Sequence, residues 1–140
     1  MDDSGANEPP AGVNATLFVS TPMIAKISRA LAWAFAAAIV ALSVVPPSLR
    51  PVTDLPHDVE HFGAFVLCGF AFGLGYRTAT LVEGAALVAF AGAIEMVQLV
   101  VPGRHARLID FAVDAIAIYV GLLIGRAVSK IVAERQREQF

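Results

Sequence analysis

The chain has 140 residues, of which 57% are hydrophobic and 16% are charged, and its formal net charge at pH 7 is −2. Its mean hydropathy of +0.70 is far above that of a soluble domain of this size and favours one small membrane domain. The sequence has no basic stripe and no basic–aromatic interleaving, which argues against a nucleic-acid partner.

Residues 1–22 differ from the rest of the chain, because they are acidic, rich in Pro, Gly and Asn, and without a helical period. This composition predicts a disordered tail. Met23 then begins a basic flank followed by an apolar run, so a translation start at Met23 is an open alternative. The same pattern is shared by signal peptides, with a poor cleavage site at residues 41–43, although the apolar run is long for one.

Four apolar stretches follow, separated by short polar breaks. They predict helices over residues 28–45, 57–76, 80–101 and 108–132 of a domain at 23–134, with a tail at 135–140. A helix of about 18–20 residues rises about 27–30 Å, enough to cross the hydrocarbon core of a bilayer. No alternating β-barrel pattern occurs. The predicted fold class is all-α, a polytopic transmembrane bundle of four helices.

Basic residues are distributed unevenly between the two ends of these helices. Seven lie at one end and three at the other: Lys26, Arg29, Arg77, Arg126, Lys130, Arg135 and Arg137 against Arg50, Arg104 and Arg107. Because Lys and Arg are enriched in cytoplasmic loops, both termini are predicted to lie inside. The His61, Glu95 and Asp110 ends of their helices then point outward.

Small residues recur four apart at Gly69/Gly73 on the second predicted helix, at Gly121/Gly125 on the fourth and at Ala30/Ala34/Ala38 on the first. Such steps allow close approach of helices, either within a bundle or in a homo-oligomer through Gly69/Gly73 or Gly121/Gly125. Asp110 and Asp114 share a face with the second glycine pair, and Glu95 shares one with Gln98. The polar groups are therefore expected to face inward.

Charged side chains at bilayer depth are costly, by at least ~2.5–3.5 kcal/mol on insertion scales, so they mark candidate sites. The predicted ligand-binding residues are His61, Glu95, Gln98, Arg104, Asp110 and Asp114. The planar guanidinium of Arg104 follows a Pro-Gly turn and suits the bridging of carboxylates. The alternative interpretation is a structural ion-pair latch that ties two helices together.

Some of the same residues are also candidates for catalysis or metal binding. Glu95, Asp110 and His61 are candidates for acid–base chemistry, but no Ser or Cys nucleophile is expected near this cluster, which weighs against covalent catalysis. His57 and His61 have a spacing that can hold a metal, with Glu95 or Asp110 as a third ligand. Without a Glu-x-x-His partner this signal is weak. No metal or other cofactor is predicted, and the catalytic status stays open.

The segments HDVEHFGAFVLCGF and EMVQLVVPGRHARLIDFAVD, followed by Gly121 and Gly125, resemble the VanZ-like family of small bacterial membrane proteins. The resemblance covers residues 54–125, and the family motifs fall on His61, Phe62, Glu95, Gln98, Arg104 and Asp110. Two positions depart from the family pattern. His57-Asp58 stands where Asp-Lys is usual, and Asp114 stands where Asn is usual.

The resemblance implies a multi-pass protein of the bacterial cytoplasmic membrane that acts on the cell envelope. The family takes its name from a member linked to glycopeptide (teicoplanin) resistance, so a role in antibiotic resistance is one expectation. Three functions are ranked in order. The first is binding of a membrane lipid or lipid-linked envelope precursor by its head group. The second is a membrane enzyme acting on such a group, and the third is a proton or ion pathway.

Overall fold

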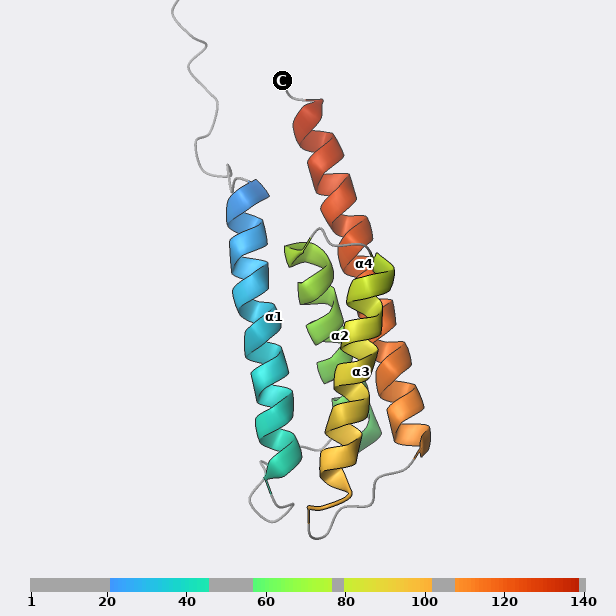
Figure 1. Cartoon of the computed structure of the whole chain (residues 1–140). Coiled ribbons are helices and arrows are strands. Elements are labelled where there is room, and N and C mark those ends of the chain that lie inside the picture. The colour runs from blue at the N-terminus through green and yellow to red at the C-terminus, as the bar shows by residue number, and fades with distance from the viewer. Residues whose placement is uncertain (1–20, 46–56, 77–79, 102–107, 139–140) are drawn as a thin grey trace, which may run out of the picture.

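The computed structural model describes residues 21–45, 57–76, 80–101 and 108–138. These residues form four helices (Figure 1): α1 (Thr21–Val44), α2 (His57–Gly75), α3 (Thr80–Gln98) and α4 (Leu108–Arg137). No strand occurs in this part of the chain. The predicted all-α class and its four helices are confirmed.

Three of the helices are long and apolar enough to cross a membrane, namely Pro22–Val44 within α1, Thr80–Gln98 and Leu108–Arg137. In α2 the apolar part, Val59–Gly75, is shorter. The outward faces carry large apolar side chains such as Trp33 (61% exposed), Leu81 (78%) and Met96 (70%). So much exposed apolar surface suits lipid and not water, so the chain is a membrane protein.

Two helices are longer than predicted. α1 begins at Thr21 instead of residue 28, so Thr21 and Pro22 belong to a helix and not to the predicted tail. Pro fits the first turn of a helix, which suits a start here. α4 continues to Arg137 instead of residue 132. Lys130 and Glu134, which are four apart and form an ion pair, support this extension.

α3 is shorter than predicted and ends at Gln98 instead of residue 101. The N–H of Val100 donates to the carbonyl of Val97, and the N–H of Val101 donates to that of Gln98, which closes a turn. Pro102 comes next in the sequence and disfavours helical geometry in the residue before it. The rest of the predicted tail, residues 1–20, lies outside the described residues.

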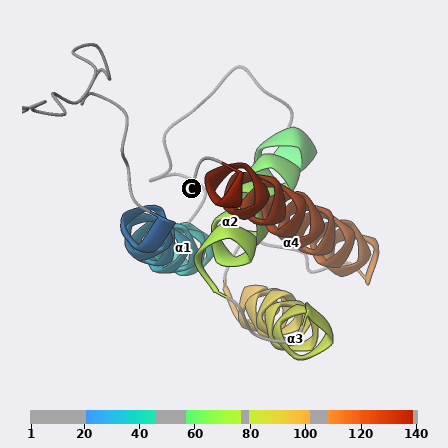
Figure 2. The ribbon, with the colours of Figure 1, turned by 90° about the horizontal axis from the view of Figure 1, so that it is seen from above.

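The helices alternate in direction, because α1 and α3 run opposite to α2 and α4 (Figure 1). Viewed along the bundle, α2 lies between α1 and α4, while α3 packs against α4 and α1 (Figure 2). We call the end where α1 and α3 finish the His61 end, and the end where they begin the Arg126 end. α4 projects beyond the other helices at the Arg126 end (Figure 1).

The most extensive helix contact joins α2 to α4 and is made backbone to backbone. The glycines predicted to allow close approach meet here, Gly69 and Gly73 on α2 and Gly121 and Gly125 on α4. A Cβ added at Gly69 would overlap the carbonyl oxygen of Ile118. One added at Gly121 would overlap that of Val66. Both glycine pairs are thus used within one chain, and a homo-oligomer through them stays a prediction.

The buried face of α1 differs from the predicted one. Ala30, Ala34 and Ala38, expected to form a contact, are exposed. Burial falls instead on Ser28, Ala32, Ala36, Ile39 and Ser43. The face that α1 buries is set by its contact with α2, where the Cys68 thiol lies 4.0 Å from the carbonyl oxygen of Ala32. Cys68 is fully buried and packs as a small apolar group, as its sequence context predicts.

Candidate functional site

The predicted site residues that the structure describes come together at the His61 end. His61 belongs to the start of α2, Glu95 and Gln98 to the end of α3, and Asp110 and Asp114 to the start of α4. At 1.5 Å per residue, His61 lies about 6 Å and Asp114 about 9 Å from the first residue of its helix. These two side chains therefore lie within the apolar body of the bundle and not at its rim.

His61 and Asp114 meet across the α2–α4 interface. Nδ1 of His61 lies 3.6 Å from Oδ2 of Asp114, and the exposed fractions of the side chains are 22% and 3%. The His61 ring also lies against Phe65, with 6.2 Å between ring centroids. An N–H···O hydrogen bond spans about 2.7–3.2 Å, so this contact is electrostatic. It leaves the Asp114 carboxylate able to accept a hydrogen bond from another group.

Gln98 has a partner that the sequence did not suggest. Its Nε2 donates to Oγ of Ser43 over 3.4 Å, and both side chains are buried. The expectation that no Ser lies near the predicted site is therefore wrong, because α1 brings Ser43 to the His61 end. In this contact the Ser43 hydroxyl meets an amide. This contact does not supply the activation that a serine nucleophile needs.

Removing the Ser43 hydroxyl is expected to have a small effect on stability. Ser43→Ala takes away the long neutral hydrogen bond from Gln98, which contributes about 1 kcal/mol or less to the free energy of unfolding. Thermal unfolding in detergent checks this, with Ser28→Ala as the control because Ser28 is the other buried serine of α1. A loss above about 3 kcal/mol, the size of a core truncation, would show instead that the contact anchors α3.

The remaining predicted residues lie at the margins of this end. Glu95 is half-buried, although it was expected to share an inward face with Gln98. The buried face of α3 consists of Glu83, Gly84, Leu87, Ala91, Ile94 and Gln98. Asp110 is half-buried in the first turn of α4, where a carboxylate also interacts favourably with the helix dipole. Arg104 and the side chain of His57 lie outside the described residues.

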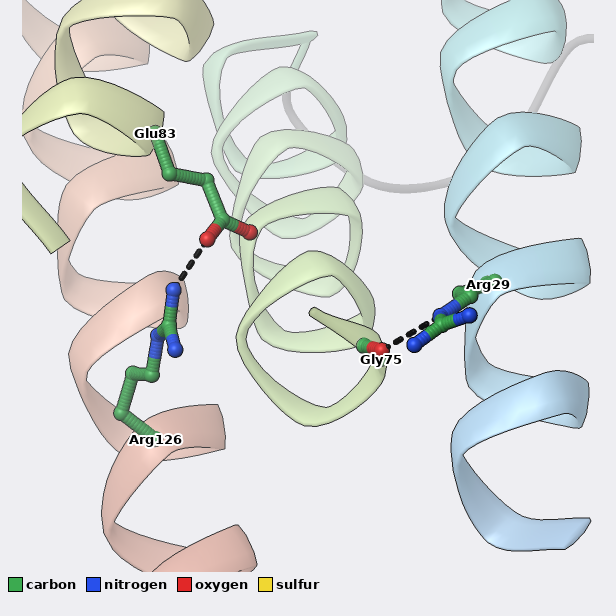
Figure 3. Close-up of polar contacts among 4 residues, drawn as sticks. All are labelled: Arg29, Gly75, Glu83 and Arg126. Carbon is green, nitrogen blue, oxygen red and sulfur yellow. Dashed lines mark hydrogen bonds and ion pairs between the residues drawn. The ribbon is translucent and has the colours of Figure 1, made fainter. Parts of the chain in front are cut away.

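The strongest ion pair of the described residues lies at the opposite end of the bundle. Nη2 of Arg126 donates to Oε2 of Glu83 between α4 and α3 (Figure 3). Glu83 is 8% exposed, and the Arg126 side chain is 21% exposed. Oε1 of Glu83 is buried and has no hydrogen-bond partner among the described residues. The pair is thus tight but incompletely satisfied, so its net stabilising effect is modest.

This pair was missed from the sequence, although a signal was present. Glu83 is an isolated acid in an apolar stretch, and Arg126 follows directly after Gly125 on the fourth helix. Arg126 was counted only as one of the basic residues at its end of the bundle. Glu83 and Arg126 are 43 residues apart, so only the packing of α3 against α4 reveals the pairing.

The chemistry available at the His61 end is that of an imidazole beside a buried carboxylate. Together these groups can bind a hydroxyl or an amino group, and the imidazole can donate or accept a proton. Within the described ranges, no three His, Cys, Asp or Glu side chains come together as metal ligands would. The arrangement is therefore suited to recognising a small polar group at membrane depth.

No family model matches the chain, and no curated protein or solved structure matches it either. The resemblance to the VanZ-like family therefore stays a prediction from the motifs quoted above. Among the motif residues, His61 and Gln98 make contacts between helices.

Proposed function

We propose that the chain is a multi-pass protein of the bacterial cytoplasmic membrane that binds an envelope lipid or a lipid-linked envelope precursor by its polar head group. The binding site lies at the His61 end. Membership of the VanZ-like family, the N-in/C-in orientation and a link to glycopeptide (teicoplanin) resistance belong to the same proposal. With both termini inside, the His61 end meets the outer leaflet.

The observation that carries this proposal is the buried carboxylate of Asp114. A charge within the bilayer costs about 2.5–3.5 kcal/mol, yet the imidazole of His61, its partner among the described residues, stands 3.6 Å away. A latch between α2 and α4 would be expected to form a closer hydrogen bond, and glycine contacts already hold these helices together. The carboxylate is instead placed to accept a hydrogen bond from a head group that reaches the partly exposed His61.

The other two functions have less support. A proton or ion pathway would have to pass between the His61 end and the Arg126 end. The largest fully buried side chains of the described core are Phe65, Cys68, Ile118 and Leu122, which do not form a chain of proton carriers. An enzyme would use Glu95 or Asp110 as acid or base, but both lie at the margin of the site. Head-group binding therefore ranks first.

Asp114→Asn tests the proposal because it removes the charge and keeps the shape of the side chain. We expect thermal stability in detergent alone to change by about 1 kcal/mol or less. Wild type should gain stability when phosphatidylethanolamine or a polyprenyl phosphate is added, since a ligand that binds only the folded state stabilises it. Asp114→Asn and His61→Gln should lose this gain.

Glu134→Gln is the matched control, since it removes a carboxylate from the same helix at an exposed position. It should respond to added lipid as wild type does. If Asp114→Asn lowered stability by about 3–5 kcal/mol without any lipid, the pair would be a structural latch and the proposal would fail. An unchanged lipid response in the Asp114 and His61 variants would have the same consequence.

A further inference from the structure

A second polar cluster lies at the Arg126 end, where α1 contacts the last turn of α2. Nε of Arg29 donates to the carbonyl oxygen of Gly75 over 2.7 Å. The guanidinium carbon lies 5.1 Å from the centroid of the Tyr76 ring, a cation–π contact. In Figure 3 the hydrogen bond between Arg29 and Gly75 lies on one side of α2, and the pair of Glu83 and Arg126 lies on the other. The guanidinium of Arg29 is thus held at Nε by the Gly75 carbonyl and on one face by the Tyr76 ring.

The fixed position of Arg29 depends on a close approach of two backbones. A Cβ added at Gly75 would lie 2.9 Å from the backbone nitrogen of Arg29 and 3.0 Å from its Cγ. Because Gly75 has no side chain, the end of α2 rests directly on α1 and presents its carbonyl to Nε. The planar guanidinium is therefore oriented before any ligand arrives. Among the described residues, its terminal nitrogens have no hydrogen-bond partner and stay available as a donor fork.

The neighbours of Arg29 along α1 complete the cluster. Lys26 is three residues before it and Trp33 is four residues after it, so all three lie on one side of the helix. Lys26 is exposed, and so is Trp33, by 61%. Nε1 of Trp33 donates to the hydroxyl of Tyr76 over 2.8 Å. Trp and Tyr are typical of the boundary between hydrocarbon and head groups, which places this cluster at that level.

The vertical order of these groups matches the order of groups in a phospholipid. Trp33 lies about 6 Å deeper along α1 than Arg29, on the side of the hydrocarbon core. Lys26 lies about 4.5 Å further out than Arg29. A phosphate held between the two cations would therefore leave its acyl chains running along the exposed indole. A soluble phosphate would make no use of Trp33.

We infer that Lys26, Arg29, Trp33 and Tyr76 form a binding site for the head group of an anionic phospholipid at the Arg126 end. Arg29 supplies an oriented donor fork for the phosphate, Lys26 adds a second charge, and Trp33 packs against the first part of the acyl chains. The site is separate from the proposed head-group site at the His61 end. It depends only on the chain being embedded in a bilayer.

Trp33 is the single tryptophan of the chain and reports directly on the lipid beside it. The full chain would be placed in mixed vesicles of phosphatidylcholine and phosphatidylglycerol, with brominated acyl chains on one lipid or the other. Bromine quenches tryptophan fluorescence on contact. We expect brominated phosphatidylglycerol to quench Trp33 more strongly than brominated phosphatidylcholine at the same mole fraction. In Arg29→Gln the preference for phosphatidylglycerol should fall about fivefold.

Three further variants make the test specific. Arg29→Lys keeps the charge without the planar fork and should lose most of the preference. Lys26→Gln should also lower it, and because Lys26 is exposed, this variant leaves the contact between α1 and α2 intact. Arg137→Gln, which removes an exposed cation from the projecting end of α4, should keep the wild-type preference.

Two results would overturn the inference. Equal quenching of wild type by both brominated lipids would mean that no anionic lipid is selected beside Trp33. An equal loss of preference in Arg29→Gln and Arg137→Gln would mean that the whole basic end of the bundle attracts anionic lipid without a site. Neither result bears on His61 or Asp114, so this inference and the proposed function can fail independently.

Discussion

Alanine in place of Gly69 or Gly121 is expected to separate α2 from α4 and to destabilise the bundle more than alanine at Gly63, Gly84 or Gly92. At both positions the new Cβ would overlap a backbone carbonyl oxygen of the facing helix, and a backbone cannot turn aside as a side chain can. We expect each substitution to lower the free energy of unfolding by about 3 kcal/mol, the upper part of the range for overpacking. Equilibrium unfolding in mixed detergent micelles measures this loss.

Gly63→Ala provides a matched control on the same helix. A Cβ at Gly63 meets nothing within 4 Å, and Ala is more favourable than Gly in a helix by about 1 kcal/mol, so this variant should be as stable as wild type or more so. Gly84→Ala should fall between, since its Cβ would lie 2.7 Å from Cε2 of Tyr119, a ring that can move. Equal stability of the Gly63 and Gly69 variants would rule out direct backbone contact between α2 and α4.

The second large effect is expected at the ion pair between Glu83 and Arg126. Glu83→Gln keeps the shape of the side chain but leaves the partly buried Arg126 without its carboxylate, and Arg126→Met leaves the 8% exposed Glu83 without its cation. Each single substitution should lower the free energy of unfolding by about 3 kcal/mol, the lower end for a buried pair because Arg126 still reaches solvent. Thermal or denaturant unfolding in micelles reports the loss.

The double variant shows whether Glu83 and Arg126 affect the free energy of unfolding as a pair or independently. Because the pair is incompletely satisfied, Glu83→Gln combined with Arg126→Met should be more stable than either single variant. Lys130 and Glu134 form the exposed comparison pair at 3.9 Å, and its loss should change stability by about 0.5 kcal/mol or less. Additive losses in the double variant would show that Glu83 and Arg126 act independently.

The faces of the helices could be predicted better than the partners of their side chains. Asp114, Gly121 and Gly125 were placed on one inward face from helical spacing alone, and all three are buried. On α3 Gln98 is buried as predicted, but Glu95 lies at the margin and Glu83 lies in the interface. Neighbouring residues of a helix are about 100° apart, so a rotation of about half that angle changes which groups meet.

A helical membrane protein, the approximate positions of its four helices and the glycines that allow close contact could all be predicted from the amino-acid sequence. Those properties follow from local composition, since a backbone in lipid must satisfy its hydrogen bonds within each helix. The packing of the helices was needed to show that His61 meets Asp114, that Glu83 meets Arg126, and that Arg29 is fixed against Gly75 and Tyr76. These contacts depend on the rotation and crossing of whole helices. Backbone contacts at the glycines of α2 and α4 set that geometry, and no single segment encodes it.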